Sequence, residues 1–125
     1  MSNNADKALE LIKFNADGLV PAIAQCHLTG RVLMMAWQNA EAVRESFATN
    51  RACYFSRSRN ELWRKGDSSG HIQNLVDFRI DCDGDTVLML VEQVGAACHT
   101  MRSDCFFSAI RDGDVVELSD PIEDA

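Results

Sequence analysis

The second half of the chain contains a predicted β-hairpin, and this hairpin constrains the fold more than any other segment. Apolar and charged residues alternate over Leu75–Ile80, so Val76 and Phe78 are expected on the same face of a strand. The Asp-Gly pair at residues 83–84 is typical of a tight hairpin turn, and the apolar run Val87–Val91 suits a buried returning strand. A hairpin of this kind needs further strands or helices against which to bury its apolar face.

The remaining sequence supplies such elements. Alternating or β-branched runs bounded by turn residues predict further strands over Leu19–Cys26, Val32–Trp37, Ala52–Ser56, Glu61–Lys65, Cys105–Ile110 and Val115–Leu118. Helical spacing predicts short helices over Ala5–Ile12 and Ala40–Thr49, with Asn39 as the N-cap of the second. These elements indicate an α+β or a mainly β domain, and we expect an α+β fold, a strand-rich single domain over residues 1–125 with one or two short helices. The acidic end, residues 119–125, is expected to be a frayed tail.

Composition and charge narrow the classes of partner. The formal net charge of −7 argues against non-specific nucleic-acid binding, which normally shows a basic excess. No early apolar run resembles a signal peptide, and the longest apolar runs are too short to span a bilayer. We expect a cytoplasmic protein with neither nucleic acid nor membrane as partner. In that compartment its five cysteines should stay reduced.

The turn of the hairpin carries three carboxylates and one thiol. In an extended chain alternate residues project to one side, so Asp81, Asp83 and Asp85 could converge on a hard cation such as magnesium, with Cys82 on the opposite side. A solvated acidic turn is the alternative. A calcium-binding EF-hand loop is excluded, because Thr86 stands where that loop requires glycine.

Three thiols are candidates for a softer metal. Cys82, Cys98 and Cys105 could hold zinc and leave one coordination position open, as catalytic zinc sites do. They form no Cys-x-x-Cys pair, so the fold or a subunit interface would have to assemble them. Buried, metal-free cysteines are the alternative. His99, beside Cys98, could be a ligand, a general base or a core histidine, and its near-neutral titration suits acid–base work.

A basic segment suggests a phosphate-binding site in this acidic chain. Arginine binds phosphate through two parallel hydrogen bonds, serine and glycine amides can cradle phosphate oxygens, and a tryptophan ring can stack on a purine. A solvated hairpin is the alternative. The candidate substrate-binding residues are Arg57, Arg59, Trp63, Arg64, Lys65, Ser68, Ser69 and Gly70.

Several unusual stretches occur together and in order within residues 14–107: 18–23, 32–36, 54–59, 62–66, Ser69-Gly70 with Gln73, Asp81–Asp85, and 97–100 through Cys105-Phe106. In these stretches the chain resembles phosphoribosyl-AMP cyclohydrolase, the purine ring-opening enzyme of histidine biosynthesis, in its monofunctional form. The resemblance implies hydrolysis of the N1–C6 bond in the adenine ring of phosphoribosyl-AMP, with a zinc-activated water attacking C6.

The resemblance also implies a homodimer. A zinc site shared between subunits would join Cys82 of one chain to Cys98 and Cys105 of the other, with magnesium at Asp81, Asp83 and Asp85. We assign His99 the role of catalytic base as a hypothesis. Cys26 and Cys53 match no family ligand and are expected to be structural.

The chain departs from the family pattern at two positions near the thiols. Met101 stands where that pattern has glycine, and Asp104 stands where it has serine. Neither change removes a ligand, but Met101 lacks the backbone freedom of glycine.

Three other functions compete with ring opening. A zinc-stabilised dimer or binding module would hold zinc without catalysis, and a thiol switch would form reversible disulfides among the three cysteines. A purine-nucleotide deaminase of the cytidine-deaminase type would need His-x-Glu and Pro-Cys-x-x-Cys patterns, which this sequence lacks.

Overall fold

The computed structural model describes residues 4–122. Its elements are α1 (Asn4–Leu11), β1 (Val20–Cys26), β2 (Val32–Gln38), α2 (Ala40–Thr49), β3 (Cys53–Ser56), β4 (Glu61–Arg64), β5 (Gln73–Ile80), β6 (Val87–Gln93), β7 (Ser108–Arg111) and β8 (Asp114–Glu117). The prediction of a strand-rich domain with one or two short helices is confirmed, and there are two of them. Within residues 4–122, no helix is long and apolar enough to cross a membrane.

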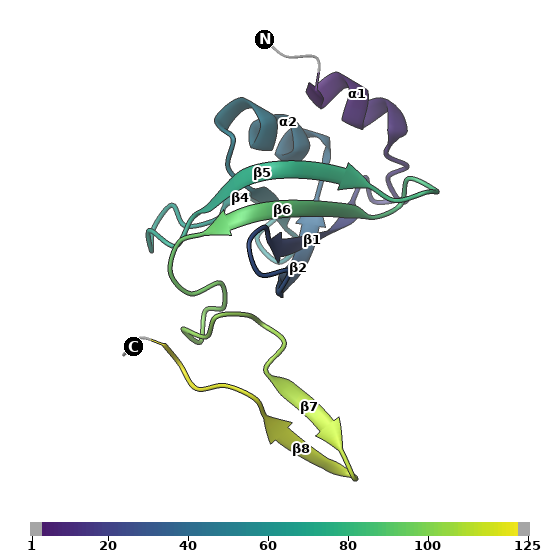
Figure 1. The fold of residues 1–125 in the computed structure, drawn as a ribbon. Helices are drawn as coiled ribbons and strands as arrows, with labels where there is room; N and C mark the ends of the chain where they lie inside the picture. The colour runs from purple at the N-terminus through teal and green to yellow at the C-terminus, as the bar shows by residue number, and fades with distance from the viewer. Residues whose placement is uncertain (1–3, 123–125) are drawn as a thin grey trace.

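Six strands form one sheet in the order β4-β3-β2-β1-β6-β5, and β7 pairs with β8 alone. Neighbouring strands of the large sheet are antiparallel except β1 and β6, which are parallel. Short turns therefore connect most neighbours, and the predicted hairpin of β5 and β6 forms one edge of the sheet (Figure 1).

The core lies between the sheet and the two helices, which sit together beside β5 (Figure 1). Ala22 and Ala24 of β1 pair in register with Val87 and Met89 of β6, and all four are fully buried. Small side chains on the central strand leave room for the larger ones beside them. The predicted cap of α2 is confirmed, since the Asn39 side chain accepts a hydrogen bond of 2.8 Å from the amide of Ala42.

The prediction that Val76 and Phe78 lie on the same face of β5 is wrong. The register between β5 and β6 shifts between Leu75 and Asp77, which leaves Val76 as an extra residue with 53% of its surface exposed. A bulge of this kind reverses the side of the sheet that a residue faces. Phe78, by contrast, turns inward as predicted, with its ring centroid 4.7 Å from that of Phe47 on α2.

The last hairpin is shorter than predicted and projects away from the main body (Figure 1). Residues 105–107 precede it without strand structure. The expected frayed tail is wrong for its first residues. The carbonyl of Ser119 accepts a 2.9 Å bond from Arg102 Nε, and the amide of Ile122 donates a 2.8 Å bond to the Met101 carbonyl. Residues 123–125 of the predicted tail lie outside the described part.

Candidate functional site

The acidic turn between β5 and β6 gathers its carboxylates as predicted. One oxygen from each of Asp81, Asp83 and Asp85 lies within 4.8 Å of the others. The cause differs from the prediction, because this segment is a tight turn and not an extended chain. Asp81 Oδ1 accepts hydrogen bonds of 2.9 and 3.2 Å from the amides of Asp85 and Thr86, which folds the turn around that carboxylate.

A glycine fixes this turn against the first helix. Gly84 has a φ of +77°, and a Cβ at this position would collide with the carbonyl oxygen of Leu11. The Gly84 carbonyl also accepts a 2.7 Å hydrogen bond from the amide of Lys13. The position and shape of the turn therefore depend on a residue without a side chain.

The three carboxylates interact with one another. Burial raises the pKa of Asp81, but hydrogen bonds from Asp85 and from nearby backbone amides outweigh it and lower the pKa of Asp81. The hydrogen bond with Asp81, followed by burial and the charges of Asp81 and Asp83, raises the pKa of Asp85. Carboxylate oxygens are the ligands that a hard cation such as Mg²⁺ prefers, and a bound cation would offset the repulsion between these three like charges.

Two of the three predicted zinc ligands lie together on the loop that follows β6. Cys98 and Cys105 lie close enough for each thiol to shift the pKa of the other, and Thr100 Oγ1 donates to Cys98 Sγ at 3.0 Å. The amide of Cys105 donates to the carbonyl of Leu33 on β2 at 2.7 Å, which attaches the end of the loop to the sheet. Adjacent thiols are a donor pair that suits Zn²⁺.

Their protonation preferences differ. Burial raises the pKa of Cys98, but hydrogen bonds from Thr100 and Cys105 outweigh it, so the pKa of Cys98 is lowered. Cys105 is exposed as a whole residue, yet the protein around its sulfur, followed by the charge of Cys98, raises its pKa to about 11. Cys98 is therefore the thiol of the pair that loses its proton more readily.

The third predicted ligand, Cys82, lies elsewhere in the chain. It sits on the acidic turn at one end of the β5–β6 hairpin, whereas the loop with Cys98 starts at the other end (Figure 1). The strand between them, β6, is seven residues long and spans roughly 20 Å. Within residues 4–122, the three thiols form no common ligand cluster.

The prediction that Cys82 points away from the carboxylates is also wrong. Its thiol donates to Asp83 Oδ1 at 3.5 Å, because the tight turn removes the alternation expected of an extended strand. Cys82 is exposed on this turn.

A cleft of about 490 Å³ joins the basic segment to the thiol loop. Six of the eight predicted substrate-binding residues line it, together with Cys98 and His99: Arg59, Trp63, Arg64, Lys65, Ser68 and Ser69. Gly70 and Arg57 are outside this lining. The Arg57 guanidinium instead lies 4.7 Å from the centre of the Trp37 ring. Most of the predicted phosphate-binding segment thus faces the predicted catalytic histidine.

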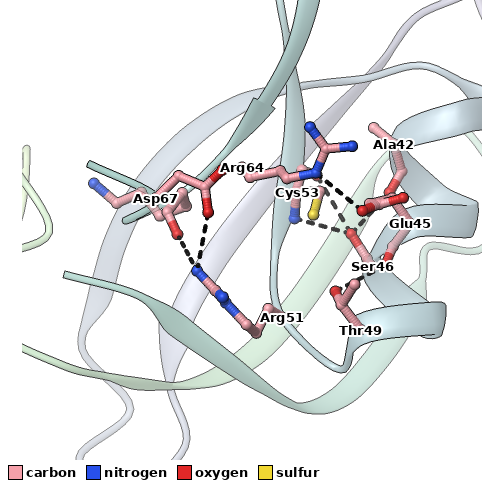
Figure 2. Close-up of polar contacts among 9 residues, drawn as sticks. Ala42, Glu45, Ser46, Thr49, Arg51, Cys53, Arg64 and Asp67 are labelled. Carbon is pink, nitrogen blue, oxygen red and sulfur yellow. Dashed lines mark hydrogen bonds and ion pairs between the residues drawn. The ribbon is translucent and has the colours of Figure 1, made fainter. Parts of the chain in front are cut away.

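Two neighbouring cations of this cleft already have partners. Arg64 Nε donates to Glu45 Oε2 on α2 at 3.0 Å, which raises the pKa of Arg64 (Figure 2). Lys65 is buried, and its Nζ donates to the Ala97 carbonyl at 2.6 Å. Burial lowers the pKa of Lys65, although the charges of Cys105 and Cys98 act in the opposite direction.

Sequence reasoning missed two residues near the cleft. The Arg51 guanidinium lies 3.4 Å from the Lys65 carbonyl and 3.8 Å from an Asp67 carboxylate oxygen, so it contacts the basic segment at two points (Figure 2). His71 lines the cleft, and its ring lies where a Cβ on Gly95 would be. Gly95 was the only sequence signal that could have indicated this close approach.

Met101 lines the cleft and adopts a left-handed conformation with φ of 67°. Glycine is the residue that accepts this conformation without strain. The chain therefore keeps at Met101 the backbone shape that a glycine would provide. Asp104, the other departure from the family pattern, pairs with Arg31 at 3.4 Å and accepts the Phe106 amide at 2.8 Å.

Fold, cleft and comparisons together define the class of protein. The family profile described as "Phosphoribosyl-AMP cyclohydrolase" matches residues 34–107. A protein of that name from Paramagnetospirillum magneticum is 64% identical over 111 residues, covering 89% of this chain and 84% of its own length. Another from Granulibacter bethesdensis is 58% identical over 116 residues, covering 92% and 91%.

A third protein of the same name, from Acidiphilium cryptum, is 60% identical over 107 residues, covering 86% of this chain and 92% of its own length. These matches identify the chain as a hydrolase of amino-acid biosynthesis. More specifically, it belongs to the phosphoribosyl-AMP cyclohydrolase family, whose members are enzymes of histidine biosynthesis.

Proposed function

We propose that this chain opens the adenine ring of phosphoribosyl-AMP by hydrolysing its N1–C6 bond in a zinc-dependent reaction. The observation that carries the proposal is the single cleft that brings the basic segment together with Cys98 and His99. A phosphorylated purine needs cations at one end and a hydrolytic group at the other, and the cleft offers both.

The described residues divide the work of binding. The exposed Arg59 guanidinium and the hydroxyls of Ser68 and Ser69 are the groups we assign to the substrate phosphate. The Trp63 ring is the face on which the purine would stack. Arg64 reaches the same cleft but is shared with Glu45, so it contributes charge with less freedom to move.

Two metals fit the donor sets. Cys98 and Cys105 would hold zinc with the partner subunit's Cys82, and Asp81, Asp83 and Asp85 would hold magnesium. Zinc in such a site would supply a Lewis acid that activates water. His99, which lines the same cleft, would accept a proton from the attacking water as general base, and N1 alkylation of the substrate would make C6 electrophilic.

The separation of the thiols supports a homodimer. Because β6 separates Cys82 from the loop of Cys98, a complete set of three thiols requires a second copy of the chain. C2 symmetry would then produce two equivalent sites.

The open face of the sheet also supports a homodimer. Ile23 pairs in register with Met35 and Leu88, so the three side chains share the face opposite the helix-covered core. None of the three is fully buried, and 46% of the Met35 surface is exposed. An apolar sheet face of this kind is typically covered by another layer or another subunit. The projecting hairpin adds exposed Ile110 and Val115.

The test is incubation of the purified protein with phosphoribosyl-AMP, with and without a chelator. We expect a product one water heavier without release of ammonia, and loss of turnover after chelation that zinc restores. Release of ammonia would favour a deaminase. Chelator-insensitive thiols that form reversible disulfides would favour a redox switch. The cytoplasmic location remains a prediction from the sequence.

A further inference from the structure

Lys65 is the only charged side chain among the buried residues of the described chain. It retains 8% of its surface, its Nζ donates to the Ala97 carbonyl at 2.6 Å, and the Trp63 ring centre lies 5.5 Å away. A buried ammonium is costly unless an opposite charge compensates it. This environment differs from that of a lysine extended toward a soluble phosphate.

No carboxylate in residues 4–122 forms an ion pair with Lys65. The acidic groups that act on its ammonium are the thiols of Cys98 and Cys105, whose negative charge favours the protonated lysine. The hydrogen bond to Ala97 places the ammonium beside the residue that precedes Cys98, and Lys65 and Cys98 line the same cleft, so the thiols assigned to zinc are its candidate counter-ions.

We propose that Lys65 is a positioning residue of the zinc site, which anchors the Ala97 carbonyl beside Cys98 and balances the charge of the thiolates. This inference rests on the zinc site of the proposed function. Three thiolates around Zn²⁺ leave one surplus negative charge, which would weaken the metal as a Lewis acid. One buried ammonium neutralises that surplus.

The local fold separates Lys65 from its neighbour. Arg64 and Lys65 are consecutive, yet Arg64 turns outward to Glu45 on α2 while Lys65 turns inward to Ala97 (Figure 2 shows the first pair). Arg51 holds the carbonyl of Lys65, and Gly66 follows with a φ of +86°. A Cβ on Gly66 would overlap the backbone of Ile72, so this tight approach fixes where the lysine enters the protein.

The proposal divides the basic segment into two parts. Arg59, Ser68 and Ser69 remain the groups for phosphate, whereas Lys65 serves the metal. Loss of Lys65 should therefore weaken zinc binding while leaving the affinity for a nucleotide phosphate nearly unchanged. Loss of a phosphate ligand would have the opposite effect.

The experiment measures zinc affinity of the purified protein by competition with a chromophoric chelator. AMP affinity is measured in parallel at saturating zinc. We expect Lys65→Met to weaken zinc binding about 10- to 100-fold, the range for partners that orient metal ligands. Lys65→Arg, which keeps the positive charge, should retain most of the zinc affinity. The uncharged Met side chain, which is similar in size, should not. Arg64→Met, the matched control, should leave zinc affinity unchanged.

Unchanged zinc affinity in Lys65→Met would overturn the proposal, as would loss of AMP binding with zinc retained. Should Lys65→Met not fold, Lys65→Gln serves in the same comparison, because its amide can still donate to the Ala97 carbonyl without charge. Zinc affinity equal to wild type in Lys65→Gln would then overturn the charge-balancing role. A wild-type protein that binds no zinc would instead refute the zinc site of the proposed function.

Discussion

The amide of Met101 donates a hydrogen bond of 2.9 Å to the carbonyl of Cys98, which closes the turn that carries the first predicted zinc ligand. Met101 makes this bond in a left-handed conformation that is unfavourable for any residue with a side chain. The geometry of the thiol loop is thus maintained at a cost in backbone strain.

Replacement of Met101 tests this strain. Met101→Gly should leave the free energy of unfolding within about 1 kcal/mol of wild type, since relief of strain offsets the greater entropy of an unfolded glycine. Met101→Val should destabilise by roughly 1–3 kcal/mol, because a β-branched residue tolerates positive φ poorly. Urea unfolding measures both, and a Met101→Val variant as stable as Met101→Gly would contradict the account.

Gly84 should be the least replaceable glycine of the acidic turn. Gly84→Ala combines positive φ with a collision against the Leu11 carbonyl, so we expect a loss of about 3 kcal/mol or more. Gly30→Ala is the matched control, with a φ of +78° and open space around its Cβ, and should lose only about 1 kcal/mol. Equal losses in the free energy of unfolding, measured by thermal or urea unfolding, would show that the contact with α1 does not contribute to stability.

The three carboxylates of the turn should bind a divalent cation, and they should repel one another when no cation is bound. Asp83→Asn should reduce magnesium affinity roughly tenfold or more, because it removes one ligand charge. Without magnesium the same variant should be at least as stable as wild type, since one like charge is removed. Asp17→Asn provides the exposed control, and calorimetric titration with MgCl₂ measures the affinity. Unchanged affinity in Asp83→Asn would exclude that carboxylate as a ligand.

His99 should affect turnover and not metal content. His99→Ala is expected to lower kcat by about 10²- to 10⁴-fold, the usual contribution of a general base. The zinc content, measured by atomic absorption, should be that of wild type. Near-normal turnover with zinc retained would refute the assignment of His99 as base. His71 is the other histidine that lines the cleft, and His71→Ala is the control. It shows whether loss of any histidine from the cleft lowers kcat or whether the effect is specific to His99.

Local patterns in the sequence predicted the elements of the fold well. The alternation before Asp83-Gly84 and the apolar run after it were sufficient for the β5–β6 hairpin, because both depend on neighbours in the chain. The bulge that exposes Val76 was not predictable in this way. It depends on how β5 meets β6, which is a property of the pairing and not of either strand alone.

The candidate site was predictable in its residue types but not in its geometry. The carboxylates converge as predicted, but through a tight turn that brings Cys82 toward Asp83 instead of away from it. The burial of Lys65 was also missed, because a lysine in a basic segment usually remains in solvent. Only the tertiary approach of Ala97 shows where its ammonium lies.

The central claim is a zinc site that two subunits complete together, and mixing two inactive variants tests it most directly. Cys82→Ala and Cys98→Ala are each expected to be inactive, because every site in either homodimer lacks one thiol. After unfolding and refolding as an equal mixture, half of the dimers should be hybrids with one intact site, which gives about one quarter of wild-type activity and zinc content. No recovery in refolded hybrids, or full activity of either variant alone, would contradict the account.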